Sequence, residues 1–223
     1  MRFKPIAWLL AGILFLGIGI IPAQPVQAAT LDELNADDTF LKQKTVDGHC
    51  TLLSTAMMLR RYSLLRGDAD WSTITEETVT SVAWMEAGVK HSFTYTTSGG
   101  GIEVAHDTLP GDASNKQILI DLLKDHPEGI VIYYTGTPHA VLLTDNTNGV
   151  FYCADPAYSY PLGRIPLDES YKVRADNVTA YWYVTSPTQQ VEGLEPEVPA
   201  PKPELVPAPR SLALITNEED FLL

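Results

Sequence analysis

The sequence predicts an α+β fold in which helices precede antiparallel strands along the chain. Apolar residues recur at helical spacing over Thr51–Leu65, and two sequences typical of a capping box, Thr73–Glu76 and Ser114–Gln117, indicate two further helices. From Ile130 onward the chain contains short runs rich in Val, Ile, Tyr and Phe, separated by turn residues. Helices and antiparallel strands that are segregated along a chain are typical of the α+β class.

The predicted elements have recognisable ends. The first helix carries basic residues at its C-terminal end, the second is expected to stop at Gly88, and the third at Pro127 and Gly129. Four strands follow, predicted at Ile130–Thr135, His139–Asp145, Val150–Ala154 and Thr179–Thr185. We therefore expect the N-terminal helices to pack on a C-terminal antiparallel sheet.

Segments at both ends of the chain differ from this domain. Residues 1–28 combine Arg2 and Lys4 with an apolar run and small residues up to Ala28, the pattern of a secretory signal peptide. Residues 187–223 begin with repeated Pro and Glu, which predicts a disordered tail. The folded domain is accordingly predicted to cover residues 29–186.

Composition and charge limit the classes of partner. The chain has 223 residues, of which 45% are apolar and 19% charged, as in a globular protein. Its net charge of −13 becomes −15 when the signal peptide with Arg2 and Lys4 is removed. Such a charge opposes binding to nucleic acids and to anionic membranes. We expect an extracytoplasmic protein, secreted or in the cell envelope, with neither of these as partner.

A predicted hairpin brings a histidine and a carboxylate together. If the turn between Asp145 and Gly149 is centred on Thr147, His139 and Asp155 lie opposite each other, with Cβ atoms about 5 Å apart. A carboxylate in that position fixes the tautomer of an imidazole and stabilises its charged form. A shift of the register by one residue would destroy this pairing.

Cys50 is the candidate nucleophile for such a histidine. It lies where the first helix is expected to begin, and the N-terminus of a helix lowers the pKa of a thiol. Gln43 is expected to donate an amide N–H beside the backbone N–H of Cys50, which together form an oxyanion hole. The histidines show no spacing typical of metal ligands, and we expect no metal and no cofactor.

Each of these residues also has a structural interpretation. After export, Cys50 and Cys153 could form a disulfide, and Cys50 could otherwise be a small buried hydrophobic residue. His139 could be a structural histidine, Asp155 an ordinary turn residue and Gln43 a surface side chain. The disulfide alternative implies a non-catalytic binding module of the same fold.

The motifs resemble those of papain-like cysteine peptidases, and among these the bacteriocin-processing branch of bacteria. The features that carry the resemblance are the Gln43…Cys50 helix start, the Pro138–Leu143 strand and the Ala154–Pro156 strand end. The resemblance extends over residues 40–185 and implies a papain-like fold with the nucleophile at the start of a helix.

The resemblance also implies a role for each residue: Cys50 as nucleophile, His139 as base, Asp155 as the group that orients it, and Gln43 as the oxyanion residue. Similarities to cell-wall amidases of the CHAP type and to transglutaminase-like domains leave an acyl transferase as an alternative. The expected activity is that of a secreted thiol hydrolase, which cleaves a peptide or protein substrate through a thioester acyl-enzyme.

Overall fold

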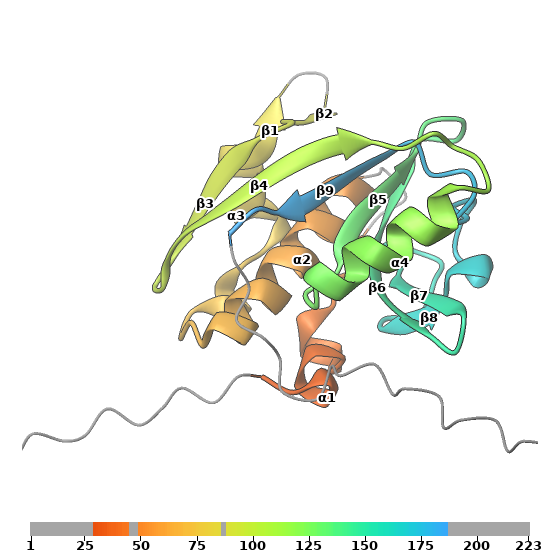
Figure 1. Ribbon diagram of the computed structural model, residues 1–223. Coiled ribbons are helices and arrows are strands. Elements are labelled where there is room, and N and C mark those ends of the chain that lie inside the picture. Colours follow the sequence, from red (N-terminus) through yellow and green to blue (C-terminus); the bar gives the residue numbers. More distant parts are fainter. Residues whose placement is uncertain (1–28, 45–48, 86–87, 187–223) are drawn as a thin grey trace, which may run out of the picture.

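A computed structural model describes residues 29–44, 49–85 and 88–186 of the protein (Figure 1). The predicted signal peptide (1–28) and the predicted tail (187–223) lie outside the described residues. The described part combines helices with antiparallel sheets, which agrees with the predicted α+β class. Within these ranges, no helix has the length and apolar character needed to cross a membrane.

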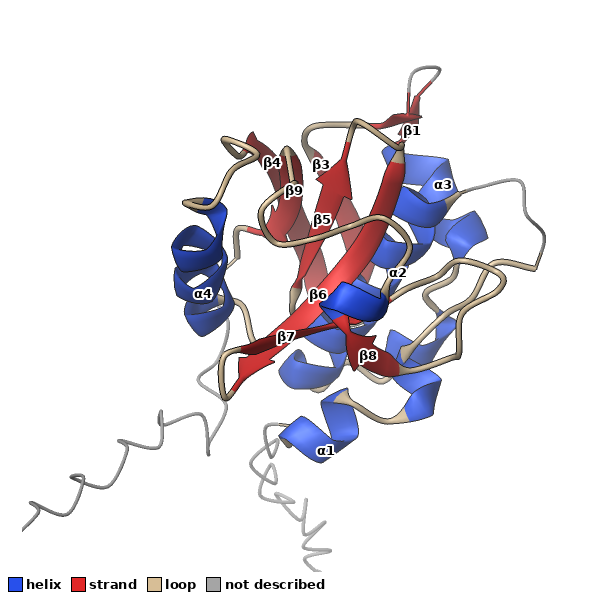
Figure 2. Ribbon diagram, turned by 90° about the vertical axis from the view of Figure 1, so that its right-hand side faces the viewer, coloured by secondary structure: helices blue, strands red, loops and turns tan. Residues whose placement is uncertain are grey.

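A seven-stranded antiparallel sheet forms the centre of the molecule, with the strand order β3-β4-β9-β5-β6-β7-β8. Its strands are β3 (Phe93–Thr97), β4 (Gly100–Thr108), β5 (Ile130–Tyr134), β6 (His139–Thr147), β7 (Val150–Ala154), β8 (Arg164–Pro166) and β9 (Ala180–Val184). A two-stranded hairpin of β1 (Trp84–Met85) and β2 (Gly88–Val89) stands at the end of the molecule where β5 ends and β6 begins, at the top of Figures 1 and 2.

Helices cover both faces of the sheet. Figure 2 shows the sheet between α4 (Asn115–Asp125) on one side and α2 (Cys50–Arg66) with α3 (Glu76–Ala83) on the other. The remaining helices are short: α1 (Leu31–Leu34), η1 (Asp37–Thr39), η2 (Trp71–Thr73) and η3 (Leu167–Glu169). This arrangement explains why β6 reads as a continuous apolar run, because a strand covered on both faces is apolar at every position.

Two hydrophobic cores lie on opposite faces of the sheet. Ala140 and Leu142 of β6 belong to the core beneath α2, against which Cys50 also packs. Val141 belongs to the core on the α4 side, together with the fully buried Cys153. The alternation of side chains along a strand thus separates the two cysteines, and both thiols are free. The disulfide alternative is therefore wrong.

A buried arginine ties α2 to two other parts of the chain. The guanidinium of Arg61 donates hydrogen bonds to the carbonyls of Glu128 (2.6 Å), Pro127 (3.3 Å) and Leu34. Burial lowers the pKa of Arg61 to about 10, although the charges of Asp145 and Glu128 raise it. This single side chain satisfies buried carbonyl groups that have no partner within a helix or sheet.

The first predicted helix and the four predicted strands are confirmed to within two residues. The predicted segregation of helices and strands is wrong, because β3 and β4 precede α4. The second helix ends at Ala83 rather than at Gly88, and its cap is Thr75, whose side chain accepts from the N–H of Thr78. The capping box predicted for the third helix, Ser114–Gln117, does not form, because Ser114 bonds to Asp112 instead.

The register of the β6–β7 hairpin also differs from the prediction. Thr147 pairs with Val150 across a two-residue turn, in which Asn148 and Gly149 have left-handed φ values of 54° and 81°. A bulge at Thr144 then shifts the pairing by one residue. The predicted turn centred on Thr147 is therefore wrong.

The bulge nevertheless restores the contact that the prediction required. On the side of the bulge away from the turn, Leu142 pairs with Ala154. The next residue of β7's chain, Asp155, therefore comes opposite Val141, and its side chain lies on the same side of the hairpin as that of His139. Residues related in this diagonal way are within reach of long side chains. If Thr144 were instead paired regularly, without a bulge, Asp155 would come opposite Leu142 and face the other side.

Candidate active site

The candidate nucleophile begins the longest helix of the described ranges. Cys50 is the first residue of α2, and its neighbour His49 caps the helix without a side-chain hydrogen bond. The first N–H groups of a helix lack partners within it and carry partial positive charge, which favours a thiolate at this position. The helix start is thus a suitable environment for an ionised cysteine.

The candidate base is held by a carboxylate, as predicted. Nε2 of His139 lies 2.9 Å from Oδ1 of Asp155, and both side chains are buried. Two backbone N–H groups hold the carboxylate in turn: Ala157 donates to Oδ1 (2.9 Å) and Tyr171 donates to Oδ2 (2.7 Å). The Asp155 side chain is therefore fixed from three directions, and it fixes the imidazole.

The structure brings Cys50 to the free side of this imidazole. Because Nε2 of His139 is engaged by Asp155, Nδ1 is the nitrogen left for the thiol of Cys50, whose pKa the imidazole lowers. The hydroxyl of Ser54, one turn along α2, donates to the carbonyl of Ala140 (3.3 Å) and so ties the helix start to the start of β6. Nucleophile and base are thus positioned by contacts between the same two elements.

The two pKa values move in opposite directions. Burial by itself raises the pKa of the Cys50 thiol, but the hydrogen bond and charge of His139, together with the N–H of Ala140 and the side chain of Thr51, bring the pKa below its ordinary value. Burial by itself lowers the pKa of His139, but the hydrogen bonds to Asp155 and Cys50 and their charges raise that pKa to about 9. These shifts favour a thiolate–imidazolium pair at neutral pH.

Gln43 also reaches the site, in a different role from the predicted one. Its amide lies against the N–H groups of His49 and Cys50, and we assign the orientation in which Oε1 accepts from both, at 3.0 Å and 3.2 Å. The opposite orientation would place three N–H donors against one another. The N–H of Cys50 is therefore bonded to Gln43 in this state, rather than paired with it as a second donor.

The backbone of the same segment joins the nucleophile to the hairpin. The N–H of Gln43 donates to the carbonyl of Pro156 (2.8 Å), directly after Asp155. The four predicted site residues are consequently linked by hydrogen bonds between Gln43 and Cys50, between Gln43 and Pro156, and between His139 and Asp155. One further bond was readable from the sequence, because Asp followed by Pro commonly accepts from the N–H two residues on, as Asp155 does from Ala157.

Sequence reasoning missed three aromatic or imidazole side chains at the site. The ring of Tyr171 meets His139 edge-on, with centroids 5.5 Å apart. On the other side, His49 contacts Glu76 through Nδ1 and the ring of Trp84 at 5.6 Å between centroids. Nothing in the local sequence marks these contacts, because each joins segments that only the tertiary structure brings together.

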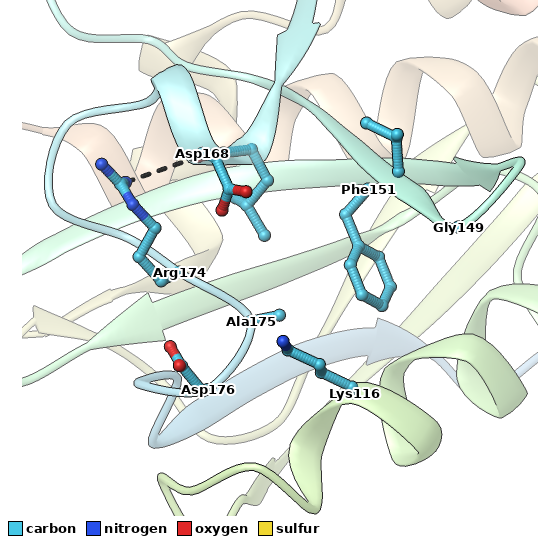
Figure 3. A pocket seen from close by; sticks show the side chains of 9 residues that line it. Lys116, Gly149, Phe151, Asp168, Arg174, Ala175 and Asp176 are labelled. Atoms are coloured by element: carbon cyan, nitrogen blue, oxygen red, sulfur yellow. Dashed lines mark hydrogen bonds between the residues drawn. The ribbon is translucent and has the colours of Figure 1, made fainter.

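A separate cavity of about 350 Å³ lies away from these residues. Figure 3 shows Phe151 and Lys116 extending into it, with the carboxylates of Asp168 and Asp176 at its edge. Arg174 is occupied by carbonyls of the neighbouring loop, including that of Val173 at 2.6 Å. The full lining is Lys116, Gly149, Val150, Phe151, Leu167, Asp168, Arg174, Ala175 and Asp176.

Within the described ranges, no group of three or more His, Cys, Asp or Glu side chains is placed to hold a metal ion. Comparison with family models, with curated proteins and with solved structures found no match for this chain.

Proposed function

We propose that the protein is a papain-like thiol hydrolase that cleaves peptide or amide bonds through a thioester acyl-enzyme. The observation that supports this proposal most directly is the hydrogen bond from His139 to Asp155 beside Cys50 at the start of α2, where the imidazole lowers the pKa of the thiol and its own pKa is raised. A nucleophile, a base and an orienting carboxylate in hydrogen-bond contact are the elements that acyl transfer needs.

The reaction follows from the protonation states. The thiolate of Cys50 attacks the carbonyl carbon, and the S–C bond forms while the carbonyl π electrons move to oxygen. As this intermediate collapses, the C–N bond breaks and Nδ1–H of His139 gives its proton to the leaving amine. Water then attacks the thioester, His139 takes one of its protons, and the acid product leaves as the thiolate forms again and His139 keeps the proton.

Gln43 has a defined task in this scheme. With no oxyanion present, its Oε1 accepts from the N–H of Cys50. An oxyanion between the two groups needs donors on both sides and so favours the reversed amide, with Nε2–H and the N–H of Cys50 directed at the same oxygen. Rotation of one terminal amide is therefore the conformational change that substrate binding requires here.

The proposal is tested by the reactivity of Cys50 towards iodoacetamide as a function of pH, followed by intact mass. A thiolate held by His139 reacts at pH 6 with little loss of rate, whereas an ordinary thiol loses about tenfold for each pH unit below its pKa. His139→Ala should restore the ordinary profile. The matched control is His126→Ala, because His126 also lies against a buried carboxylate, that of Glu128 (3.1 Å), but at the end of α4, across the sheet from the start of α2.

An ordinary profile in the native protein, unchanged by His139→Ala, contradicts the proposal. Hydrolysis and alkylation should also differ at high pH. Amide hydrolysis needs a proton from His139 and should fall above about pH 9, where the imidazolium is lost. Alkylation needs only the thiolate of Cys50 and should not fall there.

A further inference from the structure

Exposed aromatic side chains gather around the candidate active site. Trp84, Tyr158 and Tyr171 are 42%, 55% and 43% exposed, which is high for large apolar residues. Trp84 packs on His49, the residue before Cys50. Exposed apolar surface that is concentrated in one place, rather than scattered, commonly marks a binding site.

The other two aromatic residues lie by the remaining site residues. The N–H of Tyr171 is bonded to Asp155, and this bond fixes the position of its ring against His139. Tyr158 lies under the ammonium group of Lys42, 6.0 Å from its ring centroid, and Lys42 is the neighbour of Gln43. Nucleophile, base and oxyanion residue thus each have an exposed aromatic side chain nearby.

The chemistry assigns two of these rings to opposite halves of a substrate. During acylation His139 must reach the leaving amine, so the leaving half lies on the side of His139 and Tyr171. The acyl half stays bonded to Cys50, beside His49 and Trp84. A substrate side chain that covers either ring must be large and apolar to replace the water that it displaces.

Resting on the proposed hydrolase activity, we propose that the substrate is a polypeptide with bulky apolar residues on both sides of the cleaved bond. Trp84 contacts the residue of the acyl half, and Tyr171 contacts the residue of the leaving half. Peptides with small or charged residues at these two positions leave the rings uncovered and are poor substrates.

The acyl side is tested with two peptide chloromethyl ketones that alkylate Cys50, one ending in Phe and one in Gly, with iodoacetamide measured in parallel. We expect the Phe reagent to react about tenfold faster than the Gly reagent in the native protein, as for side chains that differ by several buried carbons. Trp84→Ala should reduce this preference to within about twofold, when both rates are divided by the iodoacetamide rate of the same variant. The control is Ile118→Ala, since Ile118 is similarly exposed (37%) but lies on α4, across the sheet.

The leaving side is tested with peptides that differ only in the residue after the cleaved bond, Phe or Gly. Tyr171→Ala should lower the preference for Phe in kcat/KM by about tenfold, while Tyr171→Phe retains it, because only the ring is needed. Fast iodoacetamide labelling with equal rates for the Phe and Gly reagents overturns this inference but leaves the proposed hydrolase in place. Slow labelling by iodoacetamide at neutral pH overturns the hydrolase itself, and the inference with it.

Discussion

Replacement of Asp155 by Asn separates the charge of this residue from its shape. The native carboxylate accepts hydrogen bonds from His139 and Ala157 on Oδ1 and from Tyr171 on Oδ2. An asparagine has one acceptor oxygen and one NH₂ donor. In either orientation of the amide, its NH₂ group therefore faces a donor, and at least one buried N–H loses its acceptor.

The size of the effect follows from these contacts. An unsatisfied buried donor costs about 1–3 kcal/mol. The raised pKa of His139, about 9 instead of 6.5, corresponds to about 3 kcal/mol of preference for the imidazolium, and the bond to Asp155 is the largest cause that raises it. The variant loses only part of the hydrogen bonding of the carboxylate and only part of the preference for the imidazolium. We therefore expect Asp155→Asn to lower the free energy of unfolding by about 2–4 kcal/mol at pH 7.

The pH dependence gives the sharper measurement. The stability that the imidazolium of His139 contributes is fully present below pH 6.5 and is lost as the pH rises through about 9, whereas the thiolate of Cys50 is present above its lowered pKa. The ion pair exists between these limits. Without the carboxylate the pKa of His139 falls, so the upper limit moves to lower pH and the pair becomes weaker.

We therefore expect iodoacetamide to label Cys50 at pH 6 about tenfold more slowly in Asp155→Asn than in the native protein. Urea unfolding of the same variant measures the loss of stability, and Asp168→Asn, at an exposed carboxylate of the separate cavity, serves as control. A folded Asp155→Asn variant with the native labelling profile would refute the argument that Asp155 supports the ion pair.

Three further predictions concern the fold. Arg61→Met should lower the free energy of unfolding by about 3–5 kcal/mol in urea titrations, because it leaves buried carbonyls without donors, whereas Lys124→Met on the exposed face of α4 should change it by less than about 0.5 kcal/mol. Thiol titration of the native protein should detect Cys50 only, because burial raises the pKa of Cys153; two thiols of equal reactivity would contradict its placement in the core. Gly149→Ala should cost about 1 kcal/mol by the same urea assay, since no atom lies near the added Cβ and only the left-handed backbone opposes it; an unchanged midpoint would contradict the assigned turn.

The parts of the fold that were predictable are those whose local pattern matches their environment. Helix α2 has apolar residues at helical spacing, and β7 is bounded by turn residues, so that both were located almost to the residue. Strands β3 and β4 were missed, although Tyr95 and Thr97, then Ile102 and Val104, alternate with exposed residues as in a half-buried strand. Because this alternation covers only a few residues on either side of the glycines, it does not by itself distinguish a strand from a loop.

The candidate site was predictable where it depends on neighbours in sequence. Cys50 was located by the start of its helix, and Asp155 by the end of its strand. The bulge at Thr144 was not predictable in this way. It depends on the difference in register between the pairs next to the two-residue turn at Asn148 and the pairs near Ala154. The orientation of the Gln43 amide depends on two N–H groups that the tertiary structure brings to it.

The bulge at Thr144 has a consequence for how this hairpin tolerates insertions and deletions. Removal of Thr144 would close the bulge and keep the pairs of Leu143 with Cys153 and of Leu142 with Ala154, so that Asp155 would stay on the same side as His139. An insertion or deletion of one residue elsewhere in either strand, taken up by regular pairing, would shift the register by one and turn Asp155 to the other side. A bulge is therefore what allows an odd number of extra residues between the turn and the site in this hairpin.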